Sequence, residues 1–356
     1  TQTNLMKQLG RALRDNTPKP LSLVFITSGS CANIQAIYTR VPITVNMQYI
    51  PSTLEDPAWT PASPTLSCEP PTGGVVPEIA NSALFNSACT QDPAPATVRL
   101  SEGPKQAYVI AVPKQQTEHT AITFEEAYFV FGFGMAGMIN PWMNESQMFI
   151  RTITKSTLLA WAANISVPGD KWKGIRFDGS PMVVSAIETG PPEAIGILGQ
   201  EVYDARRDTL NILAFRSRGQ YAAYYPDSNK TSHDKKNVRD GHYTVWSPTI
   251  WMDTINGAGA PVDADARYVV ELISGRSVTP AQSFDMTQIV AAVGLVPDCA
   301  MGVKRAFEGG PLSLYQPAES CVCKYESLVD TSTCAVCDGA TPCASGACRN
   351  GFCEVQ

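Results

Sequence analysis

The chain has 356 residues and a formal net charge of −6, with 44% apolar and only 17% charged residues. This composition supports a sizeable hydrophobic core and excludes an intrinsically disordered chain, while the mild acidity argues against a nucleic-acid-binding protein, which would carry a basic face. No apolar run approaches the roughly 18 residues of a membrane-spanning helix.

Hydrophobic periodicity predicts helices and strands that alternate along most of the chain. Leu5, Leu9 and Leu13 recur at four-residue spacing and predict a helix over 4–14, with Thr3 as its N-cap. Thr123 and Glu126 have the spacing of a capping box that opens an apolar helix. The other predicted strands are 21–27, 45–50, 107–112, 148–153, 194–198, 210–215 and 243–252, and the other predicted helices are 31–40, 154–164, 181–188, 265–274 and 284–293. Such alternation indicates an α/β architecture with mainly parallel sheets.

Cysteines concentrate at the C-terminal end, where seven of the 11 fall within the last 36 residues. These seven are Cys321, Cys323, Cys334, Cys337, Cys343, Cys348 and Cys353. The tail has too few apolar residues for a core of its own, which predicts a small module stapled by disulfides in an oxidising compartment. We therefore expect an exported protein, periplasmic or extracellular, from which a signal peptide has been cleaved.

The pairing of the cysteines is a separate expectation. Cys321-x-Cys323 and Cys334-x-x-Cys337 would also suit zinc, but the tail has no His and its cysteines continue in even steps, which favours disulfides. We expect most tail cysteines to pair within the tail, and Cys68 to pair with Cys89 across a long Pro-rich loop. The odd total leaves at least one thiol unpaired or paired to another chain.

Two segments share the order apolar strand, hydroxyl-rich turn and helix. In the first, the Ser28-Gly29-Ser30 turn follows strand 21–27; in the second, residues 154–157 follow Arg151. A helix N-terminus offers free N–H groups and the positive end of a dipole, which together with hydroxyl donors can hold an oxyanion. Either turn by itself could simply cap its helix, but the two together, with Arg151 beside the second, favour an anion site.

Hydrolytic chemistry is poorly supported by the sequence. The three histidines, His119, His233 and His242, lie in polar loops and turns. No G-x-S-x-G, H-E-x-x-H or P-loop motif is present, and no nucleophile–base pair stands out. We therefore expect neither an enzyme nor a bound metal or cofactor, and a secreted phosphatase-like enzyme is a distant third hypothesis.

The order of these features resembles the periplasmic phosphate-binding proteins of ABC transporters. The likeness covers most of residues 1–315 and includes YFVFGFG at 128–134 with Pro141-Trp142, YYPD at 224–227 and KNVRDGHY at 236–243. It implies a two-lobed α/β fold of the type II periplasmic-binding-protein kind, with an oxyanion held between the lobes by helix N-termini, hydroxyls, an Arg and an Asp. The Cys-rich tail from about residue 316 lies outside the likeness.

The resemblance also implies ligand-binding positions, though the match is incomplete. The positions implied are Thr1, Thr3, Ser28, Ser30, Arg151, Lys155, Ser156 and Thr157. Lys155 and Ser156 stand where the family has Ser and Gly, and the family's Ser-Asp pair appears as Ser82-Ala83, so the carboxylate that accepts a phosphate proton is missing. Lys155 could turn toward an anion, or pair with a nearby acid and leave an eroded pocket.

We expect two discontinuous lobes and two competing functions. Residues 1–108 with 218–315 would form one lobe, 109–217 the other, and 316–356 the stapled tail. The first hypothesis is an exported, non-catalytic protein that binds phosphate or another small anion. The second is a structural or assembly component of an extracellular complex, filament or coat that binds other protein subunits and reuses this fold with an eroded site.

Overall fold

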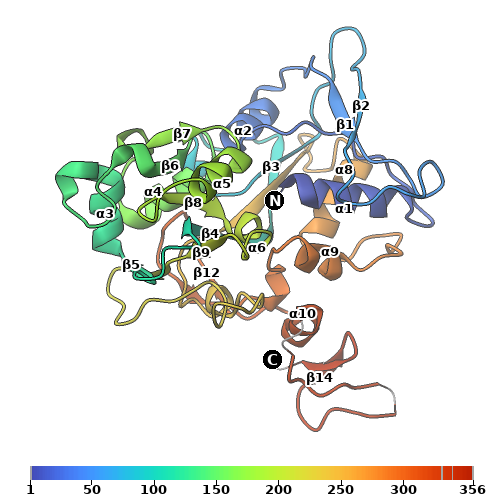
Figure 1. Ribbon diagram of the computed structural model, residues 1–356. Helices are drawn as coiled ribbons and strands as arrows, with labels where there is room; N and C mark the ends of the chain where they lie inside the picture. Colours follow the sequence, from blue (N-terminus) through green and yellow to red (C-terminus); the bar gives the residue numbers. More distant parts are fainter. Residues whose placement is uncertain (1, 330–331, 339, 355–356) are drawn as a thin grey trace. The chain divides into compact units, whose positions relative to one another are not determined.

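The computed structural model describes residues 2–329, 332–338 and 340–354 (Figure 1). The chain forms two compact units, one made of residues 1–104 and 248–293 and the other of residues 105–247 and 294–356. Within the described residues, no helix is long and apolar enough to cross a membrane.

The first unit contains helices α1 (Gln2–Arg14), α2 (Ser30–Thr39), α8 (Ala264–Ile273) and α9 (Met286–Ala292), strands β1 (Met47–Tyr49), β2 (Leu66–Cys68) and β3 (Ile79–Ser82), and the short helix η1 (Asn86–Ala88). Strand β3 pairs antiparallel with β11 (Trp246–Thr254), so that Ser82 lies opposite Ile250. The core beside this pair includes Ile34 and Ile37 from α2 and Met252 from β11. The helix predicted over 4–14 is confirmed, but Thr3 lies inside its first turn and is not its N-cap.

The second unit is built around strand β4 (Val98–Pro113), which begins in the first unit. Strands β8 (Ile195–Gly199) and β9 (Leu210–Ile212) pair antiparallel with β4, whereas β6 (Met148–Arg151) runs parallel to β8 and to β7 (Ile175–Phe177). Helices α4 (Ser156–Ile165) and α5 (Ser180–Glu188) pack against β6 and β8 (Figure 1). The sheet is therefore mixed, and the expectation of mainly parallel strands is wrong because β4 runs antiparallel to β8 and β9.

The remaining elements of the second unit lie outside this sheet. They are β5 (Ala121–Thr123), α3 (Phe124–Phe133), η2 (Gly134–Gly137), η3 (Glu145–Gln147), η4 (Gly169–Lys171), α6 (Gln200–Asp204), β10 (Ala214–Arg216), α7 (Lys236–Arg239), η5 (Asp298–Ala300), β12 (Val303–Lys304), β13 (Ser313–Leu314), α10 (Val322–Leu328), β14 (Ala347–Arg349) and β15 (Phe352–Glu354). The capping box before α3 is confirmed, because the Thr123 hydroxyl accepts from the Glu126 N–H and the Glu126 carboxylate accepts from the Thr123 N–H.

Two expectations differ from the structure. Residues 21–27 form no strand, and only Phe25 bridges to Gln48, since an apolar run becomes a strand only where a partner pairs along its length. The units divide at 104/105, 247/248 and 293/294, whereas the expected lobes divide at 108/109 and 217/218 and keep residues 294–315 in the first lobe. Residues 218–247 belong to the second unit because they hydrogen-bond within it: the Phe215 N–H donates to Tyr224 O, and the Ser217 and Thr244 hydroxyls share a hydrogen bond.

Candidate functional site

The turn between β6 and α4 brings four of the expected site residues together. Arg151 is the last residue of β6, Lys155 is the N-cap of α4, and Ser156 and Thr157 form its first turn. The Lys155 side chain makes no capping hydrogen bond, so it offers α4 none of the acceptors that Ser, Thr or Asp would provide. The N-terminus of a ten-residue helix thus lies beside a buried guanidinium group.

Arg151 is only 8% exposed, and its guanidinium group is directed at the neighbouring β7–α5 loop. Nε donates to the Phe177 carbonyl at 3.3 Å, Nη2 donates to the Asp178 carbonyl at 2.5 Å, and Nη1 donates to the Ser180 hydroxyl. Among the described residues, no carboxylate lies within ion-pair distance of this guanidinium group. Burial lowers the pKa of Arg151 below its ordinary value, although the negative charges of Asp178 and Glu201 act to raise it.

Lys155 pairs with an acid from the adjacent loop. Its Nζ lies 3.0 Å from Oδ1 of Asp178, which directly follows β7. Arg151 and Phe177 are register partners on the parallel strands β6 and β7, so the two loops leave the same edge of the sheet side by side. The hydrogen bond and charge of Lys155 lower the pKa of Asp178 below its ordinary value. Of the two alternatives for Lys155, the structure shows the second, in which the lysine pairs with a nearby acid.

Ser156 is joined to a buried hydroxyl chain. The Tyr108 hydroxyl is hydrogen-bonded to the side chains of Ser156 and Ser247, and complete burial raises the pKa of Tyr108 well above its ordinary value. Ser247 in turn donates to Oε1 of Glu308 at 2.7 Å. Thr157, the second residue of α4, is 5% exposed.

The first unit holds Ser28 and Ser30, and their hydroxyl groups already make hydrogen bonds within it. The Ser30 oxygen accepts a hydrogen bond from the Ala83 N–H at 3.0 Å, and Ser28 donates to Oδ1 of Asn33. Thr3 lies partly buried in the first turn of α1, and Thr1 lies outside the described residues. The two turns thus belong to different units.

Five disulfides are present, and one expected pair is wrong. Cys89 pairs with Cys31, not Cys68, because the first turn of α2 lies against the segment that follows β3. Cys68 has a free thiol, which confirms that the odd total leaves one cysteine unpaired. The other pairs are Cys299–Cys321, Cys323–Cys334, Cys337–Cys348 and Cys343–Cys353.

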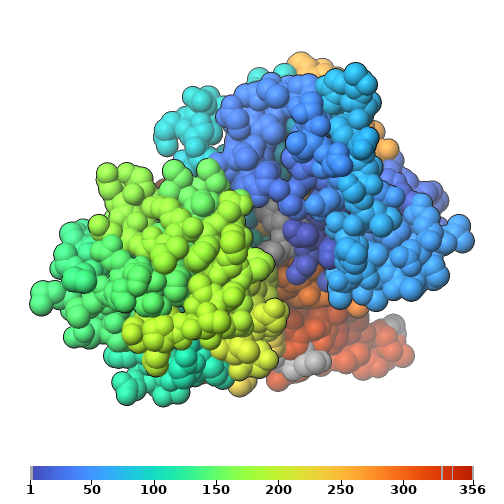
Figure 2. All heavy atoms as spheres, turned by 45° about the horizontal axis from the view of Figure 1, so that its top comes forward, coloured from blue at the N-terminus to red at the C-terminus, as the bar shows by residue number. Residues whose placement is uncertain are grey.

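Six of the seven tail cysteines pair within the tail, as expected, and the zinc alternative is not supported. The Sγ atoms of Cys337, Cys343 and Cys348 lie within 4.8 Å of one another, but each already belongs to a disulfide and cannot act as a thiolate ligand. The tail atoms form one group in the space-filling view (Figure 2, red).

The tail is fastened to the rest of the second unit by a covalent bond and an ion pair. Cys321 joins it to Cys299, and Glu326 on α10 lies 2.7 Å from the buried Arg239 guanidinium group. Glu354, which is 1% exposed, accepts hydrogen bonds from the backbone N–H groups of Cys323 and Lys324 and so caps α10. The disulfide and the ion pair explain why the tail belongs to the second compact unit.

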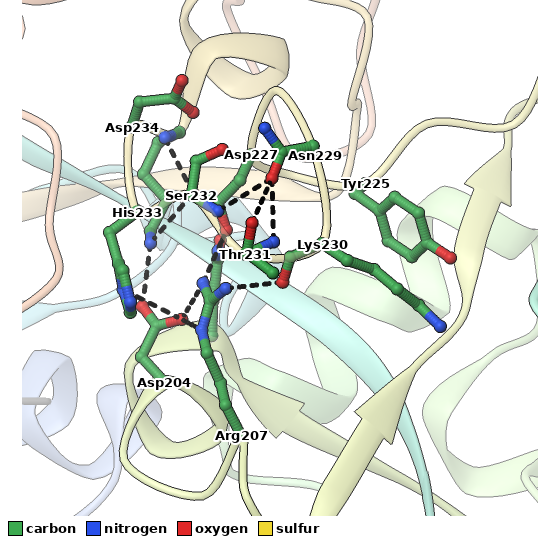
Figure 3. A network of polar contacts seen from close by, with 12 residues as sticks. Asp204, Arg207, Tyr225, Asp227, Asn229, Lys230, Thr231, Ser232, His233 and Asp234 are labelled. Carbon is green, nitrogen blue, oxygen red and sulfur yellow. Dashed lines mark hydrogen bonds and ion pairs between the residues drawn. The ribbon is translucent and has the colours of Figure 1, made fainter. Parts of the chain in front are cut away.

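A second polar cluster, which the sequence did not reveal, lies between α6 and the segment before α7 (Figure 3). Asp204 and Asp227 face Arg207 and Lys235, with the Arg207 Nη2 atom 2.6 Å from Asp204 and 2.8 Å from Asp227. Burial raises the pKa of Asp204, but Lys235 and Arg207 outweigh it and bring that pKa below its ordinary value. Asp204 and Arg207 are three residues apart, whereas Asp227 and Lys235 lie in a later segment and meet them only through the fold.

The chain is similar to known proteins in structure but not in sequence. No family model matches the chain, and no curated protein matches it. Similar solved structures include an ABC-type phosphate transport receptor from Vibrio cholerae (13% identity over 62% of this chain and 79% of that chain, TM-score 0.42). A phosphate ABC transporter substrate-binding protein from Clostridium perfringens, solved with bound phosphate, matches at 15% identity over 62% of this chain and 79% of that chain, with a TM-score of 0.43.

These structures are of the kind that the sequence resembles, and the likeness concerns the fold. At such low identities and scores, it carries no argument about a ligand. The chain is a mixed α/β protein in two compact units with a disulfide-rich C-terminal region.

Proposed function

We propose that this chain is an exported, non-catalytic protein that binds a small oxyanion, such as phosphate, at the N-terminus of α4. The observation that supports this most is Arg151, a buried cation whose protein partners are carbonyl and hydroxyl oxygens and not a carboxylate. Burying a charge is costly unless an opposite charge compensates it. A bound anion would supply that compensation.

The donor count is consistent with such a ligand. A guanidinium group has five N–H donors, and the described residues accept from three of those on Arg151. The first turn of α4 adds backbone N–H groups and the positive end of the helix dipole. With Lys155 paired to Asp178, the charges of these three side chains sum to +1, which favours an anion over a neutral ligand.

The five disulfides support export, because such bonds form and persist in oxidising compartments. A periplasmic or extracellular location would suit a protein that delivers its anion to an ABC transporter, as the sequence resemblance implies. The proposal requires no chemical step and no cofactor.

Isothermal titration calorimetry with phosphate, sulfate and small carboxylates tests the proposal. Arg151→Met should weaken binding by about 2–5 kcal/mol, or roughly 30-fold or more, since it removes a buried charge partner of the anion. Arg176→Met is the matched control, because Arg176 also donates to backbone carbonyls in this unit, those of Gly169 and Trp172, but lies outside the turn. If wild-type protein shows no binding heat with any of these anions at millimolar concentration, the proposal fails.

A second candidate function is that of an assembly component with an eroded site. It is favoured by Ser30 and Ser28, whose hydroxyl groups already make hydrogen bonds within the first unit, and by Ala83 in place of the family's Asp. The appended tail would then serve contacts with other protein subunits. Absence of anion binding, together with recovery of the protein in a large extracellular complex, would establish this alternative.

A further inference from the structure

The polar cluster between α6 and α7 surrounds a buried lysine with two carboxylates. Lys235 is 1% exposed, and its Nζ lies 3.3 Å from Oδ1 of Asp227 and 2.8 Å from Oδ2 of Asp204. Asp227 is also 1% exposed. An amine and a carboxyl group held in contact, away from solvent and next to a second carboxylate, have the parts required to form an amide.

The other oxygen of Asp227 faces two donors. Oδ2 accepts from the Gln200 Nε2 atom at 2.6 Å and from the Arg207 Nη2 atom at 2.8 Å. Figure 3 shows Asp204, Arg207 and Asp227 directed toward one another. Two such donors can stabilise the negative charge that develops on this oxygen when a nucleophile adds to the carboxyl carbon. Asp204 lies where it can take a proton from the amine.

We propose that Lys235 and Asp227 condense into an intramolecular isopeptide bond. The Lys235 nitrogen adds to Cγ of Asp227, the negative charge of the intermediate rests on Oδ2 between Gln200 and Arg207, and Oδ1 leaves. Asp204 relays protons from the ammonium group to Oδ1. Of the three ammonium protons, two depart with Oδ1 as water and one stays on the amide nitrogen, so no oxidant or other reagent is needed.

Proximity lowers the barrier to this condensation. Well-oriented intramolecular reactions reach effective molarities of about 10⁵ M or more, because the reacting groups need not be brought together from solution. The product also replaces a buried ion pair by a neutral amide, whose desolvation costs less. The ionised partners must first exchange a proton, so we expect a slow, single event after folding and not a turnover reaction.

The bond would join the two ends of the segment from Asp227 to Lys235 and close it into a ring. Lys235 directly precedes α7, which carries Arg239, the partner of Glu326 on the tail. A covalent closure at this point would hold the docking residue for the tail in place. It involves neither Arg151 nor α4, so it is independent of the proposed anion site.

The mass of the reduced and alkylated wild-type protein tests the proposal directly. The expected result is a species lighter than the sequence mass by one water. Trypsin should release a branched product that joins residues 219–230 to residues 231–236 and has two N-termini, which distinguishes it from the linear peptide of equal mass. Wild-type protein that keeps its full sequence mass after prolonged incubation would overturn the proposal.

Variants separate the roles of the residues. Lys235→Arg and Asp204→Asn should retain their full mass, the first for lack of a reactive amine and the second for lack of a proton acceptor. Asp227→Asn should lose ammonia in place of water and reach the same product. Lys230→Arg is the matched control, because Lys230 lies in the same segment but against the Tyr225 ring, and this variant should condense as the wild type does. Loss of water in Lys235→Arg would place the event elsewhere and refute the assignment.

Discussion

The Cys31–Cys89 disulfide allows a sharp test of how the first unit is held together. It joins the first turn of α2 to the residue that follows η1, across a sequence separation of 58. Replacing both cysteines by Ala removes the cross-link while Cys68 stays free. The change acts mainly on the unfolded chain, whose conformational entropy rises when the disulfide no longer closes the loop.

The magnitude follows from the loop length. In the chain-entropy model, a loop of 58 residues costs the unfolded state about 14 cal/mol/K, or about 4 kcal/mol at 25 °C. We therefore expect the double variant to lose about 4 kcal/mol of unfolding free energy in the first unit. Cys68→Ala, which breaks no cross-link, should cost less than about 1 kcal/mol.

Hydrogen–deuterium exchange in increasing urea measures this locally. Peptides from α2 and β3 report the opening of the first unit, and peptides from α5 and β8 provide an internal reference in the second. In the double variant, only the peptides from α2 and β3 should exchange at lower urea concentrations. A Cys68→Ala effect as large as that of the double variant would refute the assigned pairing and restore Cys68 as a bonded cysteine.

Three further predictions concern single carboxylates. Asp178→Asn removes the partner of Lys155, so anion binding measured by calorimetry should tighten several-fold at low salt and less at high salt; weaker binding would contradict the proposed site. Glu354→Gln removes the negative cap of α10 and should cost about 0.5–2 kcal/mol, seen as faster amide exchange in residues 322–328 with no change in α4. Burial raises the pKa of Asp234, but hydrogen bonds from Ser228 and Lys236 and the charge of Arg239 outweigh it, so that pKa lies below its ordinary value. Its stabilising effect is therefore full above the unfolded pKa of about 3.9 and is lost as pH falls through the folded pKa, so urea midpoints of Asp234→Asn should fall less steeply in acid than those of wild type.

Local chemistry explains what could be read from the sequence. The four-residue spacing of Leu5, Leu9 and Leu13 places them on one face of a helix, and all three are buried in α1. The capping box at Thr123 needs only residues three apart. The tail disulfides follow from a lack of apolar residues within a short segment. In each case the deciding interactions join residues that are close along the chain.

The candidate site was found in part for the same reason. Arg151, Lys155, Ser156 and Thr157 lie within seven residues, so one strand–turn–helix unit positions them together. The sequence left two fates open for Lys155, and only the pairing of β6 with β7 placed Asp178 beside it. The partners of the Arg151 guanidinium group come from the same neighbouring loop.

Tertiary structure alone decided the contacts between distant segments. Cys89 meets Cys31 and not Cys68 because β3 places it against α2, although Cys68 is closer in sequence. Asp204, Asp227 and Lys235 form one buried cluster because α6 and the segment before α7 pack together. Sequence periodicity records which face of an element is buried, whereas the identity of the partner depends on how the elements pair, and that is fixed only when the whole chain folds.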